Sequence, residues 1–327
     1  MRQRLSLYIA LALSVTVGAI VVMQLMDLRF FLIIAVGSAF VVAFAASLLR
    51  QRMKHGGLVL QIVVIVLIVV AFFLATTNHI VNGQLFPPTT NEAAYNTLKT
   101  NPKMEELSIN DGALTGWFVH NVEGKAPLVI YFQGRGEDSS GDLEGYNMEG
   151  LVPTANLMTF DYPGMGHSAG PPSQKNYFTM ATTVYDYALT RPDVDPTRII
   201  ILGYSLGTGV ATYLASQRNE AGLVLVAPYL NAASLLNIEV PMFYGPMKLT
   251  ITQRFNSDQY ARDVHVAPLI ISSTTDGFIP DTQAQALAAV FPQTAQVHIF
   301  TGPTHPTYFD DQTVRDTIAA YVQEVTA

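Results

Sequence analysis

The sequence of 327 residues contains no cysteine, which excludes a thiol nucleophile, a disulfide framework and a thiolate-bound metal. Charged residues are also scarce, at 13% of the chain, whereas an ordinary soluble domain has roughly 25%. The formal net charge is −7 and no long basic run is present, so nothing in the composition indicates a nucleic-acid partner.

The shortage of charge is concentrated in the first 75 residues, which contain three apolar runs at about 5–26, 30–49 and 58–75. Each run is close to the length that a helix needs to cross roughly 30 Å of hydrocarbon at about 1.5 Å per residue. A cleavable signal peptide is not favoured, because the first run is too long and two more follow it. We therefore predict that residues 1–77 form a membrane domain with three transmembrane helices.

The distribution of positive charge predicts the orientation of these spans. Arg2 and Arg4 precede the first run, and three more basic residues lie in segment 50–54 between the second and third runs. The positive-inside rule places both in the cytoplasm. Three crossings then put the rest of the chain outside the cytoplasm, with the cell membrane favoured. Residues 78–104, which include Pro87 and Pro88, are predicted to be a juxtamembrane linker.

Residues 105–327 alternate short β-rich runs with helical patterns. This alternation predicts one α/β domain with a mainly parallel, eight-stranded sheet flanked by helices. The turn Asn110-Asp111-Gly112 favours a hairpin, so the sheet is expected to begin antiparallel. The later strands are continuous apolar runs, as expected where both faces of a sheet are covered. The predicted strands are 107–109, 114–120, 128–132, 157–160, 199–203, 223–227, 269–272 and 297–300, and the predicted helices are 174–189, 206–217, 282–291 and 313–325.

A nucleophile candidate lies where the strand 199–203 passes into the next helix. The segment Gly203-Tyr204-Ser205-Leu206-Gly207 fits the G-x-S-x-G nucleophile elbow. Its turn presents the serine hydroxyl at the strand tip, near the positive end of the following helix. Because the motif has the strand before it and the helix after it, we predict that Ser205 is the nucleophile.

A serine hydroxyl needs a base to remove its proton, and the base needs an acid to orient it. In this architecture the acid and then the histidine follow the serine, each at a later strand tip. Asp276 and His305 occupy these positions. The rival candidates fit less well: Asp281 is predicted to cap the next helix, His298 lies within a strand, His120 precedes the serine, and His265 precedes its strand.

The negative oxygen that forms during acyl transfer also needs hydrogen-bond donors. The backbone N–H of Leu206 is one candidate, since it follows the nucleophile. The other is the backbone N–H of Arg135, in the glycine-containing loop after the third strand. The Arg135 side chain is predicted either to face an acidic substrate group or to lie in solvent.

These motifs resemble those of the membrane-anchored α/β-hydrolase-domain (ABHD) serine hydrolases. Phe132-Gln133-Gly134-Arg135-Gly136 is similar to their His-Gly-x-Gly oxyanion loop, and the segment 160–168 is similar to their Asp-Tyr-x-Gly-x-Gly-x-Ser turn. The segments 276–280 and 302–305 look like their acid and histidine loops. The resemblance covers roughly residues 105–325 and implies hydrolysis of an ester, thioester or amide, with no metal or other cofactor.

The sequence departs from the family pattern at Gln133, where the family often has histidine, which bears on how the oxyanion loop is held. The cap is also short, near residues 228–260, and rich in apolar residues. This segment is predicted either to form a modest lid for an acyl chain or simply to close the core. His167, in the turn after the fourth strand, is predicted to be structural.

The leading functional hypothesis is a membrane-anchored serine esterase that cleaves carboxylic esters, including lipid or acyl esters, through an acyl-enzyme intermediate. The expected partners are a small-molecule or lipid ester and the bilayer, with no protein partner indicated. A serine peptidase or amidase and an acyltransferase remain open, because the same triad serves all three and water exclusion depends on pocket shape. A catalytically silent membrane binding module is disfavoured, since binding alone has no need for all three triad residues.

Overall fold

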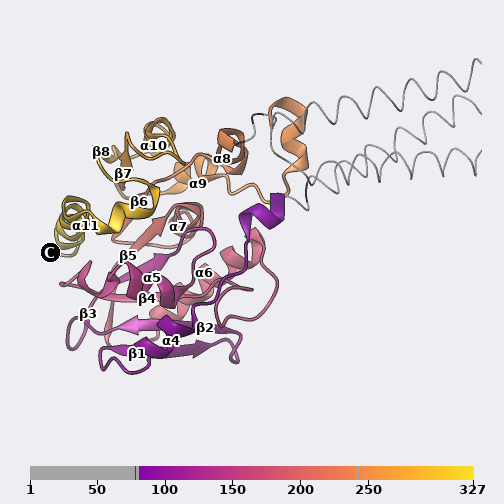
Figure 1. Ribbon diagram of the computed structural model, residues 1–327. Helices are drawn as coiled ribbons and strands as arrows, with labels where there is room; N and C mark the ends of the chain where they lie inside the picture. The colour runs from indigo at the N-terminus through magenta and orange to yellow at the C-terminus, as the bar shows by residue number, and fades with distance from the viewer. Residues whose placement is uncertain (1–77, 79–80, 240, 242) are drawn as a thin grey trace, which may run out of the picture. The chain divides into compact units, whose positions relative to one another are not determined.

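The computed structural model describes residue 78, residues 81–239, residue 241 and residues 243–327 (Figure 1). Residues 82–327 form one compact unit, separate from residues 1–81.

The membrane spans predicted at 5–26, 30–49 and 58–75 lie outside the described residues. Among the helices that the structure describes, none combines the length and the apolar character needed to cross a bilayer.

An eight-stranded sheet forms the centre of the unit, with the strand order β1-β2-β4-β3-β5-β6-β7-β8 (Figure 1). Strand β2 pairs antiparallel with both β1 and β4, and all other pairs are parallel. This arrangement confirms the predicted mostly parallel, eight-stranded sheet. The strands are β1 (Met104–Ile109), β2 (Leu114–Val119), β3 (Ala126–Phe132), β4 (Asn156–Phe160), β5 (Val194–Tyr204), β6 (Gly222–Val226), β7 (Leu269–Ser273) and β8 (Gln296–Phe300).

The predicted hairpin joins β1 to β2. Asn110 and Asp111 both have φ 55°, and Gly112 has φ 83°. Asparagine, aspartate and glycine tolerate this left-handed region better than other residues, which explains why the turn uses them.

Helices cover both faces of the sheet. One face packs against α4, α5 and α11 around a core that includes Trp117, Ile200 and Ile318. Successive side chains of a strand point to opposite faces of the sheet. The second face is covered by α6, α7 and α10. The α-helices are α4 (Glu92–Leu98), α5 (Ser139–Gly145), α6 (Gln174–Ala188), α7 (Leu206–Ala215), α8 (Ala232–Glu239), α9 (Ser257–Tyr260), α10 (Asp281–Ala288) and α11 (Gln312–Thr326). Short 3₁₀-helices are η1 (Met148–Gly150), η2 (Gly245–Thr250), η3 (Ala261–Asp263) and η4 (His305–Asp310).

Part of the segment predicted as a linker is built into the domain. Helix α4 lies within residues 78–104, and its N-cap Asn91 accepts a hydrogen bond from the Ala94 N–H at 3.0 Å. Ala94 and Leu98 are buried one helical turn apart, and Leu98 belongs to the core of the domain. A short amphipathic helix therefore stands where proline and glycine in the sequence indicated only a connection.

Strand β8 departs from the expectation that both faces of the later strands are covered. Val297 and Ile299 are each 38% exposed, and His298 is also exposed. The reason is position: β8 is the last strand of the sheet and pairs only with β7.

The segment between β6 and β7 contains α8, η2, α9 and η3. Tyr229, Leu235 and Phe243 are buried, and the Tyr229 hydroxyl donates a hydrogen bond to the Leu206 carbonyl at 3.2 Å. By contrast, Tyr244 is 59% exposed. Tyr229 therefore packs against the start of α7, while Tyr244 faces outward.

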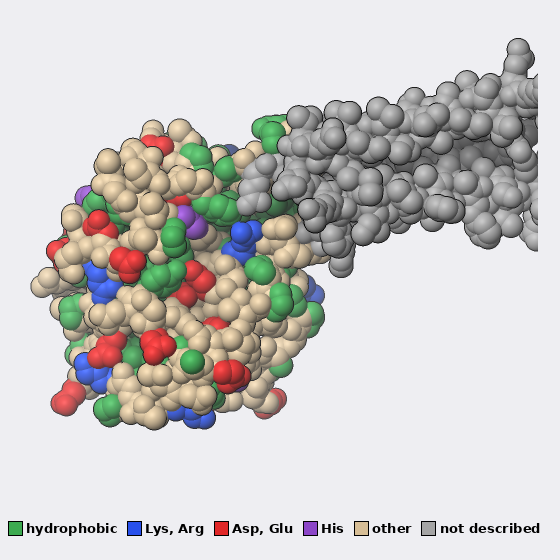
Figure 2. Space-filling model, viewed as in Figure 1, with side chains coloured by type: hydrophobic (Ala, Val, Ile, Leu, Met, Phe, Trp, Pro, Cys, Tyr) green, Lys and Arg blue, Asp and Glu red, His purple; other side chains and the backbone are tan. Residues whose placement is uncertain are grey.

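Side chains of both charge signs are scattered over the face seen in Figure 2, and no large basic patch is visible on it.

Candidate active site

The nucleophile elbow joins β5 to α7. Ser205 has φ 50° and ψ −118°, a conformation that non-glycine residues rarely adopt. Its backbone N–H donates to the Val226 carbonyl at 2.9 Å, so the sheet holds the serine at the strand tip. The positive φ at Ser205 is the strained turn expected of a G-x-S-x-G segment.

The two glycines of the motif are required by close packing. A Cβ on Gly207 would lie 2.1 Å from the Phe132 carbonyl oxygen, and a Cβ on Gly203 would lie 2.6 Å from the Gly207 carbonyl oxygen. No side chain fits at such distances from backbone atoms. The end of β3 can therefore press directly against the start of α7, which brings the oxyanion loop beside the serine.

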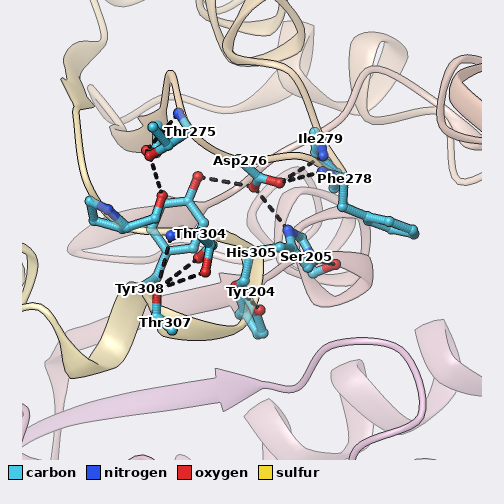
Figure 3. Close-up of polar contacts among 12 residues, drawn as sticks. Tyr204, Ser205, Thr275, Asp276, Phe278, Ile279, Thr304, His305, Thr307 and Tyr308 are labelled. Atoms are coloured by element: carbon cyan, nitrogen blue, oxygen red, sulfur yellow. Dashed lines mark hydrogen bonds and ion pairs between the residues drawn. The ribbon is translucent and has the colours of Figure 1, made fainter.

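His305 lies between Ser205 and Asp276 (Figure 3). Its Nε2 atom is 2.9 Å from Ser205 Oγ, and its Nδ1 atom is 2.9 Å from Asp276 Oδ2. The sequence separations are 100 and 29 residues, so only the fold brings the three side chains together. The His305 side chain is 19% exposed, whereas the Asp276 side chain is fully buried. The geometry matches a Ser-His-Asp arrangement in which the base reaches the nucleophile and the acid orients the base.

Asp276 is surrounded by hydrogen-bond donors. Its Oδ1 atom accepts from the N–H groups of Phe278 at 2.8 Å and Ile279 at 2.9 Å, and its Oδ2 atom also accepts from the Tyr308 hydroxyl at 3.0 Å. Burial acts to raise the pKa of Asp276, but the contact with His305 and the two backbone N–H groups outweigh it. The pKa of Asp276 is lowered as a result, which keeps the carboxylate ionised beside the imidazole.

Several contacts that the sequence did not reveal hold the histidine loop in place. The Thr275 hydroxyl donates to the Pro303 carbonyl at 2.9 Å and accepts from the Gly302 N–H at 3.0 Å, which ties the acid loop to the histidine loop. On the other side, the Tyr204 hydroxyl donates to the His305 carbonyl. The only sequence signal for Tyr204 was its place as the residue before the nucleophile.

The two predicted oxyanion donors lie on the segments that Gly207 brings together. Leu206 is the first residue of α7, and Arg135 lies in the loop after β3. Among the residues that the structure describes, none accepts a hydrogen bond from either backbone N–H. The role of both N–H groups as oxyanion donors therefore stays a prediction.

The Arg135 side chain has partners within the protein. Its Nη1 atom donates to the Gln84 carbonyl at 3.1 Å, and its guanidinium carbon lies 5.2 Å from the centre of the Phe278 ring. That ring is in turn 5.0 Å from the His305 ring. The guanidinium is therefore held at the side of the site rather than free in solvent.

Gln133, which stands where the family often has histidine, anchors the oxyanion loop. The side chain is fully buried, and its Nε2 atom donates to Thr159 Oγ1 at 2.8 Å and to the Phe160 carbonyl at 3.0 Å. The Gln133 carbonyl accepts from the Tyr162 hydroxyl at 3.1 Å. These bonds attach the loop to the end of β4, so glutamine here fastens the loop by its amide.

The rival residues lie outside the triad. Asp281 was predicted to be an N-cap, but Pro280 occupies that position; Asp281 is the first residue of α10, and it accepts from Gln285 Nε2 at 2.9 Å. His120 lies 3.0 Å from Glu105, and His265 and His298 are exposed. His167 stacks on Tyr95 with ring centres 3.8 Å apart, in keeping with the predicted structural role. Within the described part of the chain, no group of three His, Asp or Glu side chains is placed to hold a metal ion.

Comparison with known proteins identifies the class to which this fold and site belong. Residues 127–260 match the α/β-hydrolase fold family, and the chain belongs to that family.

An uncharacterised protein of Mycobacterium tuberculosis is 30% identical over 215 residues, which span 64% of this chain and 75% of the relative. The lysophosphatidylserine lipase ABHD12 of Bos taurus is 32% identical over 183 residues, which span 50% of this chain and 45% of the relative. The solved structure of the Pyrococcus furiosus esterase Pf2001 superposes with a TM-score of 0.58 at 18% identity, and covers 74% of this chain and all of the esterase. At that identity the superposition supports the fold alone. The chain is thus an α/β-hydrolase with a lipase among its relatives and an esterase among its structural neighbours.

Proposed function

We propose that this protein is a serine hydrolase of carboxylic esters that acts through Ser205, His305 and Asp276. The observation that carries the proposal is the bridging position of His305, 2.9 Å from both Ser205 Oγ and Asp276 Oδ2. A lipid or other acyl ester is the favoured substrate class, because one relative is named a lysophosphatidylserine lipase.

In the proposed reaction, Ser205 Oγ attacks the ester carbonyl carbon while His305 Nε2 takes the hydroxyl proton. The negative oxygen of the tetrahedral intermediate accepts hydrogen bonds from the N–H groups of Leu206 and Arg135. The C–O bond to the alcohol then breaks, and His305 returns the proton to the leaving oxygen. Water then attacks the carbonyl carbon of the acyl-serine while His305 Nε2 takes a proton from it. The C–O bond to Ser205 breaks, His305 returns the proton to Ser205 Oγ, and the acid is released. Asp276 stays ionised and stabilises the imidazolium in both halves of the reaction.

The decisive test is replacement of the nucleophile. Ser205→Ala is expected to abolish labelling by a fluorophosphonate probe and to lower kcat for p-nitrophenyl esters by about 10⁴-fold or more, since the other groups act on the serine. Ser216→Ala is the matched control, because Ser216 lies at the C-terminal end of the same helix. The Ser216→Ala variant should be labelled as strongly as the wild-type protein. Persistent labelling of Ser205→Ala would refute the proposal. Aminoacyl amides tested beside the esters separate an esterase from a peptidase.

We also propose that the domain is anchored in a membrane and lies outside the cytoplasm. The three apolar runs before residue 78 and the basic residues that flank them support this topology. A phosphatase reporter that works only outside the cytoplasm should be active when it is fused after Ala327. An inactive phosphatase fusion together with an active cytoplasmic reporter would contradict it.

A further inference from the structure

Two carboxyl groups meet behind the oxyanion loop and are not used in the proposed reaction. Glu137 follows the glycines of that loop, and Asp142 lies on α5, where it is only 3% exposed. The two side chains are near enough for each to act on the pKa of the other, and both pKa values are raised. Two ionised carboxyl groups that are buried side by side repel each other, so the folded state favours one proton on the pair.

The remaining contacts of the pair are with neutral donors. The Tyr131 hydroxyl donates to Asp142 Oδ2 at 2.7 Å, and the Tyr146 hydroxyl donates to Glu137 Oε1 at 2.9 Å. Burial is the main cause that raises the pKa of both carboxyl groups. The negative charges of Glu137 and Asp138 raise the pKa of Asp142 further. The charge of His305 acts to lower the pKa of Glu137, but burial outweighs it and that pKa stays raised. The surroundings therefore favour retention of the shared proton.

Glu137 also contacts the backbone of the oxyanion loop directly. Its Oε2 atom accepts from the Gly134 N–H at 2.7 Å, one residue before the proposed donor Arg135. A Cβ on Gly134 would lie 2.5 Å from that same oxygen, so the carboxyl group sits against the bare backbone. Because glycine has the greatest backbone freedom, this hydrogen bond is what restrains the direction of the peptide that follows.

The pair is further connected to the histidine loop. The Tyr146 ring packs edge-on against the Tyr204 ring, with ring centres 6.2 Å apart and the planes at 81°. The Tyr204 hydroxyl donates to the His305 carbonyl. The ring contact between the two tyrosines therefore links Glu137, which accepts from Tyr146, to the backbone of the general base.

We propose that Glu137 and Asp142, sharing one proton, act as a positioning pair that holds the Gly134–Arg135 backbone in the geometry that binds the oxyanion. The proposal rests on the proposed serine-hydrolase function and adds to it an alkaline limit. When the shared proton is lost, two carboxylates face each other, their repulsion displaces the loop, and kcat falls. The other titratable groups that face the pair are Tyr131, Tyr146, Tyr162, Tyr204, Asp138 and His305.

The test compares Glu137→Ala, Glu137→Gln and Asp142→Asn in the full-length protein, with kcat and KM measured from pH 6 to pH 10. Glu137→Ala is expected to lower kcat by about 10²-fold with KM within about threefold, similar to the loss of one oxyanion donor. Glu137→Gln should restore most of that kcat, because the amide accepts from Gly134 and donates to Asp142. In both Glu137→Gln and Asp142→Asn, the alkaline decline should disappear.

Asp161→Asn is the matched control. Asp161 is a buried carboxyl group on the neighbouring loop, where it accepts from the Ser139 N–H at 2.8 Å and the His167 N–H at 2.8 Å. Its replacement should leave the alkaline decline in place.

Two results would overturn the proposed role of the pair. One is a folded Glu137→Ala protein with kcat within threefold of wild type. The other is that Glu137→Gln and Asp142→Asn keep the wild-type alkaline decline. If Glu137→Ala does not fold, the pH profiles of the two amide variants decide the question. These outcomes differ from failure of the proposed function, which would appear as hydrolysis independent of Ser205.

Discussion

Asp276 and the Glu137–Asp142 pair are carboxyl sites near Ser205, and they differ in what surrounds them. Asp276 accepts hydrogen bonds from two backbone N–H groups, an imidazole and a tyrosine hydroxyl. Glu137 and Asp142 have a single backbone N–H and two tyrosine hydroxyls between them, and they face each other. Burial acts to raise the pKa at both sites, yet the pKa of Asp276 is lowered while those of the pair are raised.

The comparison teaches that burial does not decide the charge of a carboxyl group by itself. The number of N–H and cationic partners decides whether the ionised form outweighs the cost of desolvation. The site that must stabilise an imidazolium has such partners. The site that only holds a loop has a single backbone N–H for two carboxyl groups, and there a proton takes the place of the missing partners.

The largest expected effect comes from removing the negative charge at Asp276. Asp276→Asn keeps the shape of the side chain but presents an amide to His305 Nδ1, which favours the wrong imidazole tautomer. We expect kcat to fall by about 10⁴-fold, as in other enzymes with this triad. The measurement is the initial rate of p-nitrophenyl ester hydrolysis.

Asp281→Asn is the control for that loss, because Asp281 lies five positions away on α10 and contacts only Gln285 among the described residues. Its kcat should stay within twofold of wild type. Equal losses in the two variants would show that charge near the site, rather than the contact with His305, is responsible.

The second expected effect is on the pH dependence of stability: the contribution of Asp276 should increase with pH, and that of Asp142 should decrease. The folded pKa of Asp276 is lowered, so its contribution to stability is present above the unfolded pKa near 3.9 and is lost as the pH falls through the folded pKa. The folded pKa of Asp142 is raised, so the native state binds more protons than the unfolded state above about pH 4. Its contribution therefore falls as the pH rises.

Thermal unfolding of the full-length protein from pH 3 to pH 9 checks this difference. Relative to wild type, the Tm of Asp142→Asn should rise by a few degrees, roughly 2–4 °C per kcal/mol, between pH 4 and pH 9. The Tm deficit of Asp276→Asn should instead shrink as the pH falls below 4. Parallel curves for the two variants would break the comparison.

The smallest expected effect on activity is at the opposite end of the sheet. Arg191 precedes β5, and its Nη2 atom lies 2.8 Å from Glu105 Oε2 and 2.7 Å from Asp193 Oδ2. Its guanidinium also stands 4.0 Å from the centre of the Phe118 ring. Arg191→Met should leave kcat/KM within twofold but lower the free energy of unfolding by about 1–2 kcal/mol, a modest loss because Glu105 is 41% exposed.

Urea unfolding and ester hydrolysis, measured on the same preparation, test whether Arg191→Met lowers stability without lowering kcat/KM. Arg198→Met is the comparison variant, since Arg198 is 37% exposed, its ion pair is with the nearby Asp195, and its hydrogen bond to the Thr326 carbonyl is long at 3.5 Å. Its loss of stability should therefore be smaller. A tenfold loss of kcat/KM in Arg191→Met would mean that this end of the sheet also controls the site.

Much of the fold and the triad could be predicted from local patterns. Short β-rich runs identified the eight strands, and the G-x-S-x-G segment identified the elbow, whose glycines are needed for close backbone packing. The order of serine, acid and histidine followed from the order of strand tips. These signals lie within short stretches of sequence, where periodicity and motif spacing carry the information.

Two of the supporting contacts could not be predicted because they join segments far apart in the chain. Tyr204 reaches His305 across 101 residues, and Gln133 reaches Thr159 across 26. Glu137 and Asp142 are close in sequence, but they look like ordinary acidic residues near a helix start, and their place behind the oxyanion loop depends on the fold. The exposure of β8 was likewise hidden, because an apolar run does not say whether its strand lies at the edge of the sheet.

The backbone of Ser205 has a consequence for how this domain tolerates change. A serine at φ 50° and ψ −118° is held at a cost of about 1–3 kcal/mol. A glycine there would relieve that strain, yet it would remove the hydroxyl. Stability and activity therefore oppose each other at this position. The surrounding packing must be strong enough to keep the serine in a conformation that it would leave if the domain loosened.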